Sequence, residues 1–185
     1  MEVKLLTVKK AHMKKLKSTA QFEDKEFHKE LFQNRILDNL TRTSVKIPVS
    51  IFLIISVAVT YYSFSHNYFS AGKFVLFFIS GYIFFTFLEY MVHRFMYHTH
   101  DEMKKEGSWQ YLFHGVHHDF PKDKERLAMP PIVALVIASV FFLIFILILG
   151  KNGMALFSGF TFAYAMYLCL HYAIHTYSPP KNFLK

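Results

Sequence analysis

Residues 131–150 read PIVALVIASVFFLIFILILG and contain no charged side chain. About twenty residues of α-helix, at a rise of about 1.5 Å each, match the roughly 30 Å hydrocarbon core of a bilayer. Three other segments share this character: residues 47–65 and 153–170 are uncharged, and residues 74–92 carry only Glu89. A water-soluble chain of 185 residues would have to bury four long helices that are apolar on every side. The sequence therefore predicts a membrane protein with four spans.

The segments that join these spans differ in positive charge. Lys and Arg number eleven in residues 1–46 and six in residues 93–130, but only one each in residues 66–73 and 151–152. Cytoplasmic segments of membrane proteins carry the excess of Lys and Arg. We therefore expect both termini and residues 93–130 in the cytoplasm, in a bacterial inner membrane or the endoplasmic reticulum.

The predicted fold class is an all-α integral membrane protein. Its four transmembrane helices form two hairpins, and a helical, histidine-rich cap covers their cytoplasmic end. We expect the spans at about 47–65, 74–92, 131–150 and 153–175.

The first 46 residues form a separate basic segment. Apolar residues recur four positions apart at Phe27 and Leu31 and again at Phe32, Ile36 and Leu40, between charged residues. This spacing predicts an amphipathic helix lying on the membrane surface. The chain is thus divided into this segment, residues 1–46, and a membrane domain, residues 47–185.

Composition excludes several other classes of protein. One cysteine cannot form a disulfide within the chain, and 53% hydrophobic residues exclude bulk disorder. The net charge of +8 arises from Lys and Arg that flank the spans. Membrane orientation accounts for these basic residues, so we expect no nucleic-acid partner.

Proline and glycine residues lie at informative positions in the predicted spans. Pro48 lies near the start of the first span and Pro131 opens the third, where a missing N–H group costs little. Gly72, Gly81 and Gly159 are too scattered to form a GxxxG association face.

Seven of the eleven histidines fall into three clusters, all on the predicted cytoplasmic side. A metal needs several imidazole nitrogens that converge on one point at about 2.0–2.2 Å. A single histidine near a span end is more often an interfacial polar residue, but three clusters on one membrane face favour metal binding. The predicted ligands are His93, His98, His114, His117, His118, His171 and His175.

The spacing within the clusters differs. His171 and His175 lie four positions apart, on one face of a helix. The cluster at 114–118 likewise has one-face spacing. His93 and His98 are five apart, about 140° around an ideal helix, so they reach one site only if the helix bends or ends between them; the alternative is that they bind two different metals. Seven ligands suit two neighbouring metals better than one.

The types of ligand available limit which metal ions the site could bind. Imidazole suits zinc, copper, iron and nickel, and the single Cys169 excludes thiolate-based sites. The carboxylate di-iron pattern with repeated Glu-x-x-His is absent from the sequence. A pair of iron ions bound by histidines is therefore favoured, and copper remains an alternative metal.

Glu89 is the only acidic residue within the predicted spans and lies one turn before His93. Metal-bound histidines usually donate their second N–H to a carboxylate or carbonyl group. Glu89 is therefore a candidate acceptor in this outer layer of the metal site. The alternative is an ion pair with Arg94 or Lys73.

Three motifs carry a resemblance to a known family. They are LEYMVHRFMYH at 88–98, LFHGVHH at 112–118 and PKDKERLAMPP at 121–131. Together they resemble the fatty acid hydroxylase/sterol desaturase superfamily. The third motif points to the branch of fatty acid 2-hydroxylases. The similarity extends from about residue 51 to the end of the chain.

This resemblance implies oxygen-dependent hydroxylation of lipid acyl chains at two iron ions, which zinc can replace in a purified protein. The partners it implies are a membrane lipid substrate, molecular oxygen and an external electron donor, namely a b-type cytochrome, a ferredoxin or a reductase. Arg94 joins Glu89 as a candidate supporting residue. Five further residues are expected to shape the cap or the substrate side: Pro121, Asp123, Arg126, Pro130 and Tyr172.

One feature of the resemblance is missing. Family members usually carry a further His-x-x-His-His cluster after the Pro-Pro pair, whereas this sequence ends at Lys185, soon after Pro179 and Pro180. We expect a chain truncated before these ligands, with doubtful activity in that form. Three alternatives remain: oxidation of a sterol, carotenoid or other lipid, a haem-binding membrane cytochrome, and a non-catalytic metal-binding protein.

Overall fold

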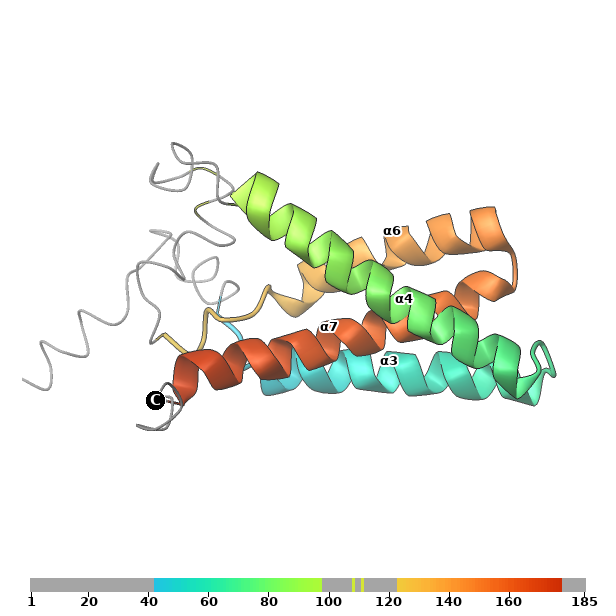
Figure 1. Ribbon diagram of the computed structural model, residues 1–185. Coiled ribbons are helices and arrows are strands. Elements are labelled where there is room, and N and C mark those ends of the chain that lie inside the picture. Colours follow the sequence, from blue (N-terminus) through green and yellow to red (C-terminus); the bar gives the residue numbers. More distant parts are fainter. Residues whose placement is uncertain (1–41, 98–107, 109–110, 112–122, 178–185) are drawn as a thin grey trace, which may run out of the picture.

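A computed structural model describes residues 42–97, 108, 111 and 123–177 of the chain. Its main elements are four long helices (Figure 1), each long and apolar enough to cross a membrane. This confirms the predicted all-α architecture with four spans. The described part of the chain contains no strand. The helices are α3 (Lys46–Ser65), α4 (Ala71–Val92), α6 (Pro131–Leu149) and α7 (Asn152–Thr176), and a π-helical turn η1 (His93–Tyr97) extends α4.

The helix ends follow from local sequence. Pro131 occupies the first position of α6, where its missing N–H leaves no hydrogen bond unmade. Gly150 ends that helix with a φ of 56°, a left-handed conformation that glycine adopts without strain. All four helices begin and end within three residues of the expected spans.

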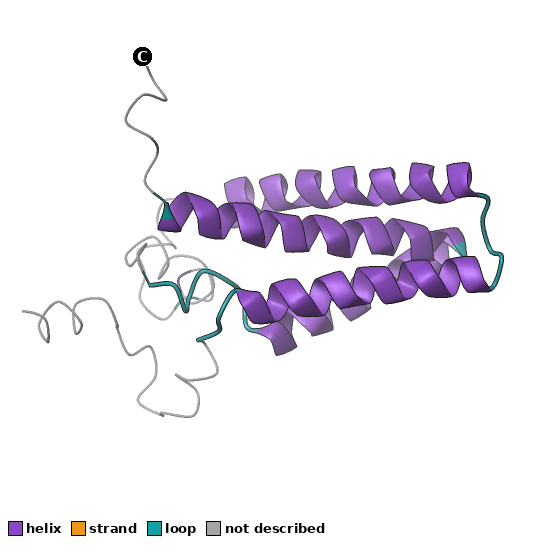
Figure 2. Ribbon diagram, turned by 90° about the horizontal axis from the view of Figure 1, so that it is seen from below, coloured by secondary structure: helices purple, strands orange, loops and turns teal. Residues whose placement is uncertain are grey.

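Helix α7 is the centre of the bundle. It packs against α3, α4 and α6, whereas no Cα atoms of α3 and α4, or of α4 and α6, approach within 8 Å. Figures 1 and 2 show α3 and α7 lying side by side along most of their length. More than half of the apolar window of α7 is buried, against less than a quarter in each other helix. Helices α3 and α4 follow each other in the sequence, but the main packing partner of each is α7.

Two glycines allow α4 and α7 to touch through their backbones. A Cβ atom at Gly81 would lie 1.9 Å from the carbonyl oxygen of Leu156, and one at Gly159 would lie 1.9 Å from that of Phe78. The lack of a GxxxG spacing within one helix therefore did not exclude a close contact between these two helices. Gly81 on α4 meets the backbone of α7 at Leu156, and Gly159 on α7 meets the backbone of α4 at Phe78. A sequence motif within one helix does not reveal such a contact.

Hydroxyl groups join α3 to α7 at the buried face. Ser56 Oγ donates to the carbonyl oxygen of Ser158 at 2.9 Å, and Ser158 Oγ donates to that of Ser56 at the same distance. Thr60 Oγ1 lies 2.7 Å from Ser158 Oγ. Hydrogen bonds of this kind stabilise helix pairs in membranes, where water offers no competing partner.

Most of the predicted cap, residues 93–130, lies outside the described residues. Its described parts are the turn η1 at the end of α4, residues 108 and 111, and residues 123–130, which lead into α6. The predicted amphipathic helix within residues 1–46 lies outside them as well. The division of the chain at residue 46 stays a prediction.

Candidate functional site

A cavity of about 350 Å³ lies among α4, α6 and α7. Its walls are almost wholly apolar. At its deep end the rings of Phe85 and Phe141 lie 5.2 Å and 5.0 Å, centroid to centroid, from that of Phe160. The backbones of α4 and α6 stay apart, with no Cα atoms within 8 Å, and the rings of Phe84 and Phe145 meet between these helices at 5.8 Å, centroid to centroid. An apolar cavity within the spans suits a hydrocarbon chain supplied by the bilayer.

The opposite end of this cavity is polar. Glu89, Tyr97 and Tyr164 line it there, and the same three residues line a second, smaller cavity of about 70 Å³. The smaller cavity continues to Arg126 and His171. Apolar space near the middle of the bundle thus leads through hydroxyl and carboxyl groups to a predicted metal ligand.

His171 and His175 lie together on α7, as predicted. Their ring centroids are 4.7 Å apart, and His171 also stacks on Tyr167 at 5.4 Å. With metal–nitrogen distances of about 2.1 Å and angles of about 90–110°, two imidazoles on one metal have centroids about 4.5–5.2 Å apart. The pair therefore has a separation that suits two ligands of one metal.

His93 begins the π-helical turn η1 at the end of α4. A π-helix forms hydrogen bonds between residues five apart, which brings such residues close to one face. For both His93 and His98 to reach one site, the sequence requires the helix to bend or end between them, and the α-helical geometry of α4 does change to π-helical geometry at His93. His98 itself lies outside the described residues, so its position stays a prediction.

Glu89 is half-buried and forms a side-chain hydrogen bond with Tyr167. Arg94 instead donates to the hydroxyl of Tyr90 and lies 5.4 Å from the ring centroid of Phe95. Among the described residues no ion pair joins Glu89 to Arg94 or Lys73. This geometry directs Glu89 toward the cavity and α7, and Arg94 toward exposed rings.

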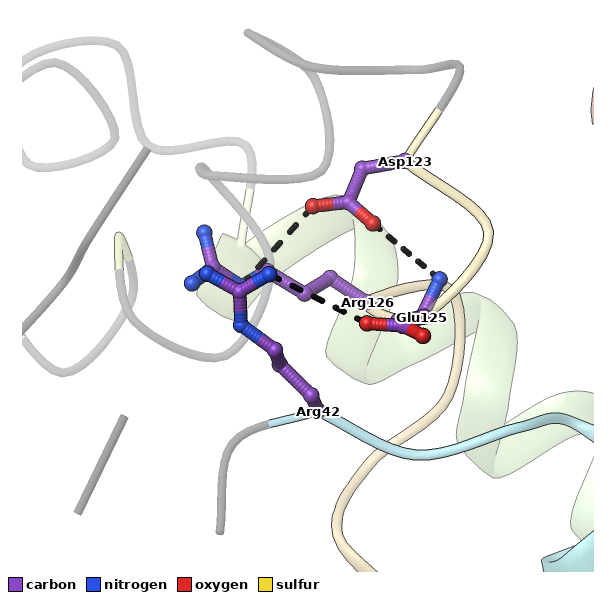
Figure 3. A network of polar contacts seen from close by, with 4 residues as sticks. All are labelled: Arg42, Asp123, Glu125 and Arg126. Carbon is purple, nitrogen blue, oxygen red and sulfur yellow. Dashed lines mark hydrogen bonds and ion pairs between the residues drawn. The ribbon is translucent and has the colours of Figure 1, made fainter. Parts of the chain in front are cut away.

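Asp123 and Arg126 form a buried pair in the turn before α6 (Figure 3). Their side chains are 0% and 2% exposed, and Arg126 Nε lies 3.9 Å from Asp123 Oδ2. Asp123 Oδ1 also accepts the backbone N–H of Glu125 at 3.1 Å. The Glu125 carboxylate in turn lies 3.8 Å from the Arg42 guanidinium. Asp123 thus holds the turn, while Arg126 additionally lines the smaller cavity.

The remaining predicted residues fall in different places. Pro130 is half-buried directly before α6. Tyr172 is half-buried on a face of α7 away from both cavities. Among the described residues no group of three or more possible metal ligands converges. The other predicted site residues lie outside the described part: His98, His114, His117, His118 and Pro121.

Three tyrosines were missed by the sequence reasoning. Tyr97, Tyr164 and Tyr167 all line the polar cavity, and none belongs to a predicted cluster. A signal was present on α7, because positions 164, 167 and 171 share one helix face. It was masked by the many aromatic residues of the same span.

Comparison with known proteins bears directly on this site. Residues 78–185, more than half of the chain, match the fatty acid hydroxylase family. The chain belongs to the fatty acid hydroxylase family. The matched region begins within α4 and includes α6, α7 and both predicted histidine-bearing helix ends, so the family match covers the walls of both cavities apart from Phe52.

Curated relatives in this family act on lipid acyl chains by their names. A fatty acid 2-hydroxylase of Mus musculus is 36% identical over 116 residues, 59% of this chain and 30% of the relative. A ceramide very long chain fatty acid hydroxylase of Schizosaccharomyces pombe is 36% identical over 115 residues, 60% of this chain and 33% of the relative. A dihydroceramide fatty acyl 2-hydroxylase of Arabidopsis thaliana is 33% identical over 106 residues, 57% of this chain and 45% of the relative.

A solved structure of a fatty acid hydroxylase has a similar fold. It is described as full length scs7p with only the hydroxylase domain visible, and it superposes with a TM-score of 0.69 at 27% sequence identity. The match covers 81% of this chain and 57% of that chain. This chain spans less than half the length of the three curated relatives.

Proposed function

We propose that this protein hydroxylates lipid acyl chains, as its named relatives do, in a reaction that consumes molecular oxygen. The observation that carries the proposal is an apolar cavity that shares Glu89, Tyr97 and Tyr164 with a second cavity lined by His171, in a member of the fatty acid hydroxylase family. Hydroxylation next to an acyl carbonyl requires a reactive centre where an apolar tail meets a polar head. The junction at Glu89, Tyr97 and Tyr164 is a place of that kind.

The metal ligands we propose are the seven clustered histidines, holding two iron ions. The 4.7 Å separation of the His171 and His175 rings and the π-helical turn at His93 support this assignment. When bound, the irons would supply the oxidising chemistry needed to break an unactivated C–H bond. The Tyr167 ring stacks on His171 and would fix its orientation, and Glu89 would hold Tyr167 in place through the hydrogen bond between them.

The chain's own residues would bind and orient the substrate. The acyl tail would pass from the bilayer between α4 and α6 and lie against Phe85, Phe141 and Phe160. Apolar walls exclude water from the tail and fix its depth, which selects the carbon presented to the metals. Arg126 and the tyrosine hydroxyls would contact the polar head of the lipid.

Electrons for the reaction would come from a separate b-type cytochrome, ferredoxin or reductase. The positive charges of residues 93–130 orient this part of the chain to the cytoplasm. A soluble donor would then approach the metals from that side.

Expression in a host that lacks 2-hydroxylated lipids tests the proposed activity. Lipid mass spectrometry should detect hydroxylated acyl chains with the native protein and lose them with His171→Ala. His66→Ala is the matched control, because His66 is exposed at the opposite end of the bundle and bonds to Tyr62. Hydroxylated sterol or carotenoid instead of acyl chains would favour the alternative substrates. Absence of any product with a competent donor and bound iron would overturn the proposal.

A further inference from the structure

A groove of about 460 Å³ opens on the opposite side of α7 from the catalytic cavities. We name it the α3–α7 groove, formed by the start of α3, the turn at 124–125 and the end of α7. It has no lining residue in common with the two cavities already described. It lies at the end of the bundle where α3 begins and α7 ends, which is the predicted cytoplasmic interface.

Among the described residues that line the groove, positive charge is in excess. Lys46 and Lys124 line it and are both exposed. Glu125 also lines it, but its carboxylate lies 3.8 Å from the Arg42 guanidinium, which offsets its charge. The backbone N–H of Thr43 donates to the carbonyl oxygen of Glu125 at 2.7 Å and fixes the start of α3 against the turn. This hydrogen bond sets the relative position of the two backbone segments that carry Lys46 and Lys124.

Below the lysines the groove is apolar. Val49 on α3 and Ala173 and Cys169 on α7 line the part that continues along the membrane spans. Tyr177, which is 70% exposed, lies at the rim. Tyrosine at this level is typical of the boundary between headgroups and hydrocarbon. The groove thus offers cationic groups at headgroup level and an apolar channel at acyl level.

We propose that the α3–α7 groove binds an anionic phospholipid. Its phosphate lies between Lys46 and Lys124, and one acyl chain follows α3 and α7 past Val49. Basic pockets between spans on the cytoplasmic side bind lipid phosphates in this way. The lipid is a structural or regulatory ligand and not the substrate, because α7 separates this groove from the cavities.

Cys169 makes the proposal directly measurable, because it is the only cysteine in the sequence, lines the groove and is exposed. A bimane fluorophore on Cys169 reports contact with brominated lipids by quenching. The full chain is placed in phosphatidylcholine vesicles that contain either brominated phosphatidylglycerol or brominated phosphatidylcholine at one mole fraction. We expect stronger quenching by the anionic lipid, a preference of about five-fold for each lysine, and a weaker preference at high salt.

Paired substitutions separate a local site from general attraction. Lys46→Gln with Lys124→Gln should abolish the preference. Lys73→Gln with Lys151→Gln removes the same charge at the other end of the bundle and should leave it intact. Equal quenching by both lipids, or a preference unchanged by the first pair, would overturn the proposal. Displacement by soluble glycerol phosphate would identify a phosphate site instead of a lipid site and would overturn it too.

Discussion

Tyr167 connects the acidic residue of the spans to a predicted metal ligand. Its hydroxyl is hydrogen-bonded to Glu89, and its ring stacks on His171 at 5.4 Å between centroids. Both contacts restrict the orientation of His171. Groups that orient a ligating histidine contribute strongly to metal affinity, although they do not touch the metal.

Tyr167→Phe tests this orienting role. The variant keeps the stacked ring but loses the hydroxyl that bonds to Glu89, so iron content and hydroxylation should fall by about ten-fold or more. Iron is measured by elemental analysis of the purified protein. Tyr61→Phe, which removes a hydroxyl from a side chain that is 74% exposed, is the control. Unchanged iron content in Tyr167→Phe would contradict the role.

The contribution of sequence differs from residue to residue. The helical spacing of His171 and His175 predicts their proximity, because both lie on one continuous helix. The partner of Glu89 was not predictable, since Tyr167 lies on another helix and sequence spacing carries no information across the bundle. The spacing of His93 and His98 left open a bend or end of the helix and two separate metals, and it did not predict the π-helical geometry that begins at His93.

At the scale of elements, the crossing of α4 and α7 positions the site. Both helices line the two cavities, and their backbones meet where Gly81 and Gly159 leave no room for a side chain. Four spans and their approximate ends followed from charge-free segments. The central place of α7 did not, because an all-apolar helix can face lipid or protein equally well.

Gly159→Ala should separate the two helices. The added methyl would lie 1.9 Å from the Phe78 carbonyl oxygen, and backbone cannot yield as a side chain does. We expect a loss of about 3 kcal/mol in stability, measured by thermal unfolding in detergent. Gly72→Ala is the matched control, because its methyl would meet nothing within 4 Å. Equal stability of the two variants would show that the crossing tolerates a wider separation.

Ser158→Ala should loosen the contact between α3 and α7. Ser158 Oγ bonds to the Ser56 carbonyl at 2.9 Å and to Thr60 Oγ1 at 2.7 Å. Loss of these interhelical bonds should cost about 1 kcal/mol, read from the unfolding midpoint. Ser139→Ala, which removes only a bond to a carbonyl of its own helix, should have a smaller effect. A larger loss at Ser139 would contradict this assignment.

At the scale of the whole molecule, the bundle encloses a cavity that we propose holds an acyl chain. Three of its helices surround an apolar cavity that ends at one side in polar groups and at the other in an aromatic cluster around Phe160. The sequence predicted the membrane setting, and its family resemblance predicted a lipid substrate. The shape of the cavity depends on packing between helices and had to come from the structure.

Phe160→Ala should lengthen this cavity. Phe160 forms the deep end of the cavity with Phe85 and Phe141, so its removal should shift the hydroxylated products toward longer acyl chains. Lipid mass spectrometry gives the product distribution. Phe157→Ala removes an equally buried ring that does not line the cavity, and should destabilise the protein without this shift. The same shift in both variants would contradict the assignment.

The account depends most on the claim that a histidine-bound metal at the polar end of the cavity hydroxylates acyl chains. The most direct measurement is the position of the new hydroxyl group in lipids from a host that expresses the native protein or His171→Ala. We predict acyl chains hydroxylated at the carbon next to the carbonyl with the native protein and none with His171→Ala. The same hydroxylated acyl chains in undiminished yield from His171→Ala would contradict the claim.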